Sequence, residues 1–431
     1  MATLLEPVAG ADAVWLQDSP TNLMVINAVF VTDRMDLATF RRIFGERVLA
    51  VEEGRRYPRF RRRIAWVRGR PWWEEDPGFD LAHHIVAPGE PIRSTAQLQE
   101  YVGREAARPL PSDRPPWQIQ VIEEFEDEGT AFLVRIHHCM GDGISLVPII
   151  FELMDPAEPG SAGHLRPAAG APQARSALHA LGLALRVPLA APGILLRRML
   201  WPRDRHALHG PPVSGSKRVG WTRPFDLQVV KEAKNRLGAT VNDVLMATVS
   251  GAFSRYLQAK AGKAVATIRI SMPVNVRPPD EPLRMGNRFA AVPLELPAGI
   301  HELPRRVLAV KRRMDALKQS VEPIVVYHIV NVLLQALPQG ASRGLIDFLA
   351  NKCTAVVTNV PGPQRPLLLA GRRVRSLIFW VPQRADIGLG ISMMSFSGKV
   401  QIGVLADARL VPEPGEMVRA FEEEFEELRT L

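Results

Sequence analysis

The sequence predicts an α/β protein with two lobes, each built on a mixed sheet, and a crossover segment that joins them. Its 431 residues are enough for two or three domains of roughly 100–200 residues. Short apolar runs alternate with helical stretches in residues 1–155 and again in residues 216–431, whereas residues 156–215 have a different composition. We therefore expect an N-terminal lobe, a linker and a C-terminal lobe with these bounds.

In the first lobe, the clearest pair of elements is a strand followed by a helix. The segment AFLVRIHH at 131–138 is rich in residues that favour strands. After a short turn, the apolar segment ISLVPIIFELM at 144–154 predicts a helix.

The linker has two parts. Residues 156–175 are rich in Pro, Ala and Gly, which is typical of a connector. Residues 176–203 are apolar and helix-prone, and Pro188 and Pro192 predict a break into two short helices. Two interpretations stay open: a connecting helix packed on the body of the protein, or a surface that enters a bilayer or lipid droplet. In the second interpretation the lipid headgroups would meet four arginines, Arg197, Arg198, Arg203 and Arg205.

The second lobe is predicted to contain a long helix, five strands and a terminal helix. Residues 240–260 have helical periodicity, and Asn242 or Asp243 could form the N-cap. From Pro414 the chain predicts an amphipathic helix whose acidic run forms a solvated face. The expected strands are ATIRISMPVNV (266–276), TAVVTNV (354–360), VRSLIFWV (374–381), LGISMMSF (389–396) and KVQIGVLAD (399–407).

Composition narrows the functional classes. The net charge is +9, and 45 of the 54 basic residues are arginines, which suit phosphates, a phosphate-bearing coenzyme or an anionic lipid surface. We expect no nucleic-acid partner, because the charge is not gathered into a basic helix or finger motif. The two cysteines imply no disulfide framework and fit a reducing compartment. We expect neither a secretory signal nor a membrane-spanning helix, and no nucleotide-binding glycine motif is present.

The most informative segment is IHHCMGDGIS at 136–145. Neighbouring residues of a strand point to opposite faces, so His137 and His138 cannot both enter one cleft from a regular strand. One histidine is therefore a candidate base and the other is structural. Asp142 lies between two glycines in a sequence that suits a tight turn into the following helix. Its carboxylate could hold the loop by pairing with an arginine.

These residues carry a resemblance to a known family. HHCMGDG matches the HHxxxDG motif of the acyltransferase superfamily with chloramphenicol-acetyltransferase-like lobes, which includes peptide-synthetase condensation domains and carnitine acyltransferases. Over nearly the whole chain the sequence resembles the bacterial wax ester synthase/diacylglycerol acyltransferase family. The further matching motifs are LEPVAGADAVWLQDSPTNLMVINAVF at the start, PPW at 115–117, VNDVLMA at 241–247, SMPVNVR and MGN within 271–287, TNVPGP at 358–363 and GISMMSFSGKVQIGVLAD near the end. Two positions depart from the family pattern: Pro116 replaces a leucine, and Thr358 a common serine.

The resemblance implies a fold of two chloramphenicol-acetyltransferase-like lobes, with mixed sheets flanked by helices, and assigns the second histidine of the motif, His138, as the general base. A histidine near neutral pKa can take the proton of an alcohol as the hydroxyl attacks a thioester, which accelerates such reactions by ~10²–10⁴-fold. His137 and Asp142 are expected to hold the loop, and Gly143 to permit a close approach or an unusual φ. The oxyanion donor is not identified. Three arginines are candidate partners of Asp142, namely Arg135, Arg277 and Arg288.

The implied reaction is acyl transfer from acyl-CoA, as co-substrate, to diacylglycerol or a long-chain fatty alcohol, which makes triacylglycerol or a wax ester. It requires no metal and no tightly bound cofactor. The implied location is the cytoplasm, at the inner membrane or the surface of lipid droplets. Alternatives are another alcohol acceptor, a carrier-protein-bound donor, or a non-catalytic lipid-binding protein of the same fold. Acceptor, acyl length and oligomeric state do not follow from the motifs.

Several other residues have two interpretations. Asn242 and Asp243 could cap their helix or brace the site. Asn275, Gly286 and Asn287 could shape the acyl or alcohol channel or simply form turns. Trp117 is expected to be a packing residue.

Three further features could be taken for functional sites. We expect two of them to be structural, and the third has two possible interpretations. Cys139 should be a small buried hydrophobe, because its side chain and those of the neighbouring histidines point apart. His83 and His84 should have a structural or channel-wall role, because no further ligands with zinc spacing accompany them. The basic run RRYPRFRRR at 55–63 is either a solvated face or an anion-binding surface.

Overall fold

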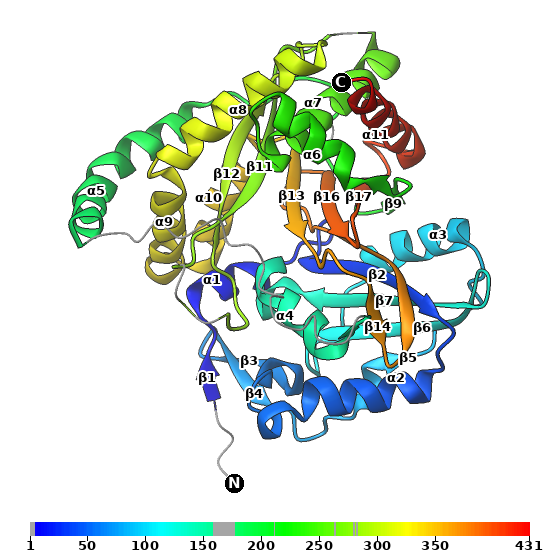
Figure 1. The fold of residues 1–431 in the computed structure, drawn as a ribbon. Coiled ribbons are helices and arrows are strands. Elements are labelled where there is room, and N and C mark those ends of the chain that lie inside the picture. Colours follow the sequence, from blue (N-terminus) through cyan, green and yellow to red (C-terminus); the bar gives the residue numbers. More distant parts are fainter. Residues whose placement is uncertain (1–4, 158–176, 211, 263, 279–280, 282) are drawn as a thin grey trace.

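The computed structural model describes residues 5–157, 177–210, 212–262, 264–278, 281 and 283–431. Two α/β lobes are stacked on each other (Figure 1), with the N-terminal part of the chain in the lower lobe. Each lobe contains a seven-stranded sheet with both parallel and antiparallel pairs, which confirms the predicted fold class.

The first sheet lies at the centre of the first lobe. Its strands are β2 (Val25–Asp33), β5 (Ile85–Val86), β6 (Trp117–Phe125), β7 (Gly129–His137), β8 (Asp155–Pro156), β14 (Leu367–Leu369) and β15 (Arg372–Trp380). They lie in the order β5-β6-β7-β2-β15-β14-β8, and only β5 and β6 run parallel. A separate small sheet holds β1 (Leu5–Pro7), β3 (Arg62–Val67) and β4 (Arg70–Glu75) in the order β1-β4-β3.

Helices cover both faces of the first sheet. Helices α2 (Leu37–Phe44) and α4 (Gly143–Leu153) share a hydrophobic core with one face, where Phe30 and Phe132 lie. Helix α3 (Thr95–Ala106) packs on the opposite face together with Leu405 of the second lobe. The alternation of side chains along each strand gives each face its own core. The first lobe is therefore packed directly against the second.

The second sheet has parallel strands at its centre. Its strands are β9 (Lys217–Trp221), β10 (Phe225–Asp226), β11 (Ile268–Asn275), β12 (Phe289–Leu296), β13 (Ala355–Pro361), β16 (Leu389–Phe396) and β17 (Lys399–Asp407). The order is β10-β17-β16-β13-β11-β12, with β9 also paired to β17, and β13 runs parallel to both β11 and β16. Its helices are α6 (Leu227–Arg236), α7 (Val241–Ala261), α8 (Leu303–Gln319), α9 (Glu322–Ala336), α10 (Gln339–Ala350) and α11 (Pro414–Arg429).

One hairpin crosses between the lobes, so the sheets depart from the expected division of the chain at residue 216. Strands β14 and β15 come late in the sequence but belong to the first sheet, where β15 pairs antiparallel with β2 (Figure 1). In this register Phe379 lies opposite Ala28 and Leu377 lies opposite Phe30. The hairpin occupies an edge of β2 that would otherwise present unpaired backbone groups.

The apolar segment after the linker forms one helix, α5 (Ala177–Leu200), so the predicted break into two helices is wrong. Pro188 and Pro192 both lie inside it. A proline removes one backbone hydrogen bond, and two prolines four residues apart concentrate the loss on one side, which a helix can accommodate by bending. None of the helices in the described part of the chain is long and apolar enough to span a membrane.

The acidic run of α11 is not a fully solvated face, so that expectation is wrong at Glu424. This side chain is only 1% exposed and forms ion pairs with Arg306 of α8 and Arg255 of α7. Gly251 of α7 makes room for it, because a Cβ there would overlap the Glu424 carboxylate. The buried carboxylate therefore ties three helices together.

Candidate active site

The HHxxxDG segment forms a compact loop between β7 and α4. Strand β7 ends at His137, a 3₁₀ turn spans His138–Met140, and α4 begins at Gly143. Asp142 is the N-cap of α4, because its side chain accepts a hydrogen bond from the backbone N–H of Ser145 at 2.9 Å. The loop geometry is thus set by a short-range capping interaction.

The two histidines diverge, as the strand geometry predicted. The Nε2 atom of His137 lies 2.9 Å from a carboxylate oxygen of Asp18, and its Nδ1 accepts a hydrogen bond from the backbone N–H of Cys139. His138 instead lines a large cavity. His137 therefore fixes the strand end, and His138 is the histidine available to a ligand.

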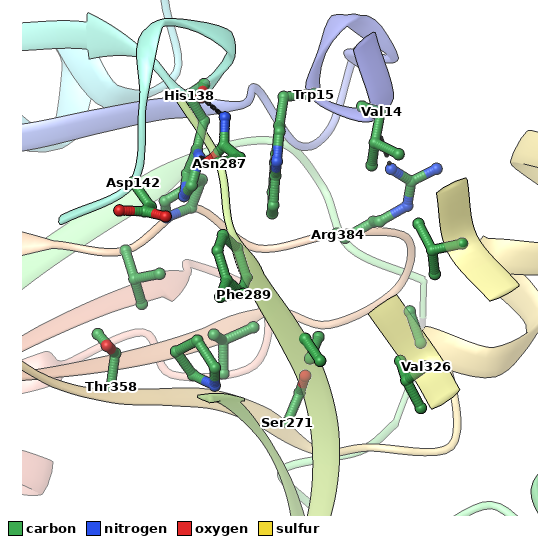
Figure 2. Close-up of a pocket in the computed structure, with 18 of the residues that line it drawn as sticks. Val14, Trp15, His138, Asp142, Ser271, Asn287, Phe289, Val326, Thr358 and Arg384 are labelled. Atoms are coloured by element: carbon green, nitrogen blue, oxygen red, sulfur yellow. Dashed lines mark hydrogen bonds between the residues drawn. The ribbon is translucent and has the colours of Figure 1, made fainter. Parts of the chain in front are cut away.

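The cavity has a volume of about 280 Å³ and lies where the lobes meet. Figure 2 shows His138, Trp15 and Asp142 on the side of the first lobe, facing Phe289 and Thr358. The lining is mostly apolar and extends to α9, α10 and the end of α5. Polar groups on its wall in the described residues include Ser271, Asn275, Arg277, Asn287, Tyr327, Asn331, Thr358, Asn359 and Arg384.

Asn287 determines which nitrogen of His138 carries the proton. The Nδ2 group of Asn287 donates to Asp12 Oδ1 at 2.9 Å and to the backbone carbonyl of His138 at 2.7 Å. The amide oxygen of Asn287 therefore faces His138 Nδ1, 2.8 Å away, and can only accept a hydrogen bond. It follows that Nδ1 carries the hydrogen and Nε2 has a free lone pair.

The surroundings of His138 keep its imidazole neutral. Burial lowers the pKa of His138 to about 4, although Asp142 and the Asn287 hydrogen bond act in the opposite direction. The Trp15 ring stacks on the imidazole with centroids 3.9 Å apart and planes inclined by 15°. The ring is thus held in place, and Nε2 is unprotonated at neutral pH.

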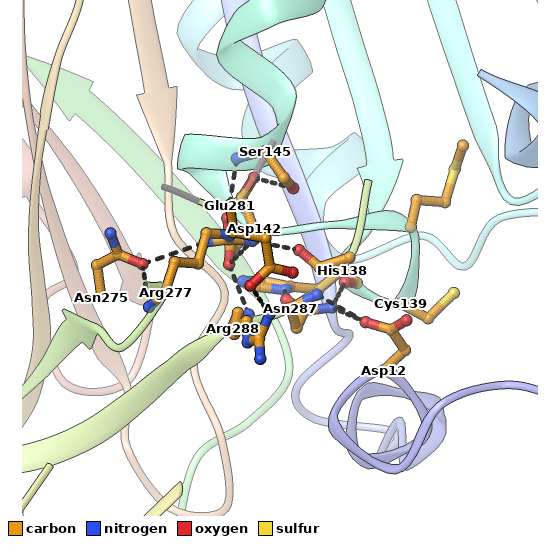
Figure 3. A network of polar contacts seen from close by, with 12 residues as sticks. Asp12, His138, Cys139, Asp142, Ser145, Asn275, Arg277, Glu281, Asn287 and Arg288 are labelled. Atoms are coloured by element: carbon orange, nitrogen blue, oxygen red, sulfur yellow. Dashed lines mark hydrogen bonds and ion pairs between the residues drawn. The ribbon is translucent and has the colours of Figure 1, made fainter. Parts of the chain in front are cut away.

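Asp142 links the two lobes (Figure 3). Its carboxylate lies 2.8 Å from the guanidinium of Arg277, and each side chain is only 8% exposed. It also accepts a hydrogen bond from the backbone N–H of Arg288 at 2.9 Å. Of the three arginines considered, Arg277 is thus the ion-pair partner, while Arg135 pairs with Glu105.

Four residues near the site were missed by the sequence interpretation. Asp12 accepts hydrogen bonds from both nitrogens of Asn287 and pairs with Arg59 at 2.8 Å. Arg59 also donates to the carbonyls of the 3₁₀ turn, so this member of the basic run at 55–63 braces the HHxxxDG loop rather than facing solvent. Together with Trp15 and Asp18, Asp12 comes from the N-terminal segment that contributed to the family resemblance. The resemblance of that segment to the family was the one signal in the sequence that could have pointed to these residues. A matching segment does not say what each of its residues does.

The secondary candidates divide into two groups. Asn275 and Asn287 line the cavity, as the channel interpretation expected. Asn242 and Asp243 do not line it, and the N-cap of α7 is Thr240. Asp243 completes a capping box by accepting from the Thr240 N–H, so it supports the cap without being the N-cap residue.

Asn242 contacts a residue of the cavity wall, whereas Gly143 lines the cavity itself. The side-chain oxygen of Asn242 accepts from Asn359, which does line the cavity. Gly143 does not have a positive φ, so an unusual φ is not its role. A Cβ at Gly143 would lie 3.2 Å from Val360, so the glycine permits a close approach.

The remaining candidate residues pack in the interior of the first lobe. Cys139 is fully buried in the core of the first lobe. His84 stacks on Trp117 with ring centroids 4.5 Å apart, and its Nδ1 lies 2.9 Å from the Trp117 carbonyl. Trp117 in turn donates to the Phe60 carbonyl, which agrees with the predicted packing role. Among the described residues no group of His, Cys, Asp and Glu side chains could hold a metal ion.

Comparisons with family models match both halves of the chain. Residues 8–200 match the wax ester synthase/diacylglycerol acyltransferase catalytic domain, and residues 285–429 match the C-terminal domain of the same family. A Mycobacterium tuberculosis protein named "putative diacylglycerol O-acyltransferase" is 29% identical over 396 residues, covering 83% of this chain and 82% of its own length. Another from that organism, "probable diacylglycerol O-acyltransferase tgs1", is 27% identical over 376 residues, covering 82% and 80%.

Solved structures share the two-lobed fold. The wax ester synthase/diacylglycerol acyltransferase from Marinobacter aquaeolei VT8 superimposes with a TM-score of 0.70 at 21% identity, covering 99% of both chains. The first condensation domain of the calcium-dependent antibiotic synthetase gives a TM-score of 0.61 at 16% identity, covering 99% of this chain and 96% of that domain. At these identities the likeness establishes the fold alone.

Proposed function

This chain belongs to the wax ester synthase/diacylglycerol acyltransferase family, and on that premise we propose that it transfers the acyl group of acyl-CoA to diacylglycerol, to a long-chain fatty alcohol, or to both. The observation that carries the proposal is the position of His138. Its imidazole lines the cavity between the lobes, and Asn287 leaves Nε2 free as a base. A general base in a largely apolar cavity suits a reaction between an alcohol and a thioester that both carry long chains.

In the proposed reaction, Nε2 of His138 takes the proton of the acceptor hydroxyl as its oxygen attacks the thioester carbonyl. The new ester C–O bond forms, the C–S bond breaks, and the imidazolium returns the proton to the sulfur of coenzyme A. The Nδ1 hydrogen bond to Asn287 orients the ring during both transfers. No acyl-enzyme intermediate is required.

The developing oxyanion needs hydrogen-bond donors near His138. We propose the backbone N–H groups of Gly143 and Ile144, which begin α4 and line the cavity. The first N–H groups of a helix lack acceptors within the helix, and the helix dipole favours negative charge at this end. Asp142 uses the N–H of Ser145 for the cap, which leaves the two preceding groups to the ligand.

The reaction can be tested with the purified chain. Radiolabelled palmitoyl-CoA is offered with dioleoylglycerol and with hexadecanol in parallel, and the neutral lipids are separated afterwards. We expect labelled triacylglycerol, labelled wax ester or both. A parallel arm with palmitoyl-carrier protein tests the donor: transfer from this donor but not from palmitoyl-CoA would contradict the assignment of acyl-CoA. If the protein binds the palmitoyl chain but forms no labelled ester, the result would favour a non-catalytic lipid-binding protein.

We also propose that the protein acts in the cytoplasm at the surface of the inner membrane or of lipid droplets. Helix α5 exposes Leu189 (82%), Leu196 (58%) and Leu200 (74%), which are spaced to share one face. The end of the same helix is anchored to the body, because Arg198 and Arg197 both pair with Glu322. The helix can therefore be both a connecting helix packed on the body and a lipid-binding surface, because one side of it packs on the protein while the other side is exposed.

Replacing Leu196 and Leu200 together by glutamate should weaken binding to anionic liposomes by about tenfold or more, because two leucines no longer enter the interface. Liposome flotation measures the bound fraction. The control is Leu308→Glu, which places the same charge on an exposed leucine of α8 and should leave binding unchanged. Equal flotation of the parent and the α5 variant would rule out this face as the docking surface.

A further inference from the structure

The cavity between the lobes has a basic end that the proposed reaction does not use. On the side of the second lobe, its wall includes residues that directly follow α5 and α10, namely Trp201, Lys352 and Cys353. Helices α5, α9 and α10 lie together on this flank of the molecule (Figure 1). Trp201 and Lys352 are half-buried, so the cavity borders the surface here.

Lys352 is a cation of the cavity wall that has no carboxylate partner in the part of the chain that the structure describes. The three arginines on the same wall are all paired: Arg198 with Glu322, Arg277 with Asp142 and Arg384 with Asp347. The Nζ atom of Lys352 instead lies 4.2 Å from the centre of the Phe348 ring. Its positive charge is therefore not neutralised by these neighbours.

A second cation, Arg203, is held next to Lys352 by Arg269 of β11. The Nη1 group of Arg269 donates to the backbone carbonyls of Pro202 and Lys352, at 2.9 and 3.0 Å. Its guanidinium also lies over the Trp201 ring, 4.0 Å from the centroid. Arg203 itself is exposed and forms no ion pair with any described residue. Two unpaired cations are thus fixed side by side at the edge of the cavity.

The nearest carboxylate does not neutralise them. Asp204 follows Arg203 in the chain, but one of its carboxylate oxygens accepts hydrogen bonds from the Arg269 backbone N–H and the Thr354 hydroxyl, each at 2.8 Å. Burial, together with the charges of Arg203 and Arg269, lowers the pKa of Lys352. A bound anion would offset this repulsion.

A phosphate group suits these two side chains. A lysine binds phosphate as a point charge, and an arginine binds it through a fork of parallel hydrogen bonds. The surroundings favour a phospholipid as its source, because Leu196, Met199 and Leu200 of α5 are 58%, 43% and 74% exposed just before Trp201. A phospholipid carries apolar chains beside its phosphate, whereas the phosphate end of coenzyme A has none to cover these side chains.

We propose that Lys352 and Arg203 bind the phosphate of an anionic phospholipid, which holds this end of the cavity against the monolayer that supplies the acceptor. The inference rests on the proposed action at a lipid surface. The leucines of α5 provide apolar attraction, and the two cations provide the preference for an anionic headgroup. Arg197 and Arg198 do not share this role, because both pair with Glu322.

The first test removes both charges in the double variant Arg203→Gln/Lys352→Gln. Its binding to vesicles that contain phosphatidylglycerol should fall by about tenfold or more, while binding to pure phosphatidylcholine vesicles stays at the parent level. Flotation measures the bound fraction. The matched control is Lys231→Gln/Arg236→Gln, which removes a lysine and an arginine from exposed positions of α6 and should bind as the parent does. Equal losses in the two variants would mean that net charge attracts the protein, and would overturn the site.

The second test reports on one side chain and needs no vesicle. Trace acetylation with acetic anhydride, followed by mass spectrometry, measures how accessible the Lys352 amine is. Dihexanoylphosphatidylglycerol, a soluble anionic phospholipid, should slow acetylation of Lys352 several-fold and leave that of Lys231 unchanged. Protection by coenzyme A and not by this lipid would overturn the lipid assignment, and protection by neither would overturn the phosphate site. Protection by the lipid in a protein that forms no ester would refute the proposed reaction but keep the site.

Discussion

Replacing His138 by alanine should lower kcat/KM for ester formation by about 10²–10⁴-fold, the range for loss of a positioned general base. The side chain is buried and lines the cavity, so its truncation removes the Nε2 base while the capping interactions of the loop remain. The assay with palmitoyl-CoA measures the rate, and circular dichroism measures whether the variant is folded. Ester formation at the parent rate in a folded His138→Ala protein would require another base.

The matched control is His137→Gln. His137 contacts Asp18 and lies at the end of β7, but it does not line the cavity. A glutamine can keep a hydrogen bond to the carboxylate, so this variant should retain most of the activity. Comparable losses in both variants would indicate a general disturbance of the loop instead of the loss of a base.

The same assignment has a signature in the pH profile of the parent protein. Because burial lowers the pKa of His138 to about 4, the neutral base is present throughout the neutral range and is lost only as the pH falls through that value. We expect kcat/KM to stay level between about pH 8 and about pH 6, and to decline below about pH 5. An acid limb centred near the ordinary histidine value of about 6.5 would contradict this environment.

Local patterns in the sequence predicted much of the fold. The strands LGISMMSF and KVQIGVLAD coincide with β16 and β17, and the helix after HHxxxDG is α4. These elements are recognisable because side-chain alternation, turns and helix starts depend on neighbours in the chain. The cap of α7 was misplaced by two or three residues, because Thr240, Asn242 and Asp243 are all acceptable capping types.

Contacts between segments that are distant in the chain could not be predicted from the sequence. The β14–β15 hairpin pairs with strands of the first lobe, and no local pattern states which sheet edge a strand will join. The partner of His138 is Asn287, which is 149 residues away and could equally have been a turn residue. Asp12 and Arg59 are similar cases, because a charged residue is usually solvated unless a distant partner is brought to it.

Replacing Asp142 by alanine should destabilise the protein by about 3–5 kcal/mol, because Arg277 is left as a buried charge without its partner. With an unfolding entropy of roughly 2.1 cal/mol/K per residue, the midpoint of thermal unfolding should fall by about 3–6 °C. Activity should fall as well, since the carboxylate also holds the Arg288 backbone next to Asn287. Calorimetry and the ester assay measure the two effects.

Two further variants separate the ion pair from the helix cap. Asp142→Asn can keep the hydrogen bond from Ser145 while losing the charge, so it should retain the cap contribution of about 1 kcal/mol and still leave Arg277 unpaired. Adding Arg277→Met removes the second charge and should recover much of the lost stability, because burying neither charge costs less than burying one. If the double variant is no more stable than Asp142→Asn, the ion pair between Asp142 and Arg277 does not stabilise the contact between the lobes. The stability lost in Asp142→Ala must then come from the helix cap and from the hydrogen bond with the Arg288 backbone.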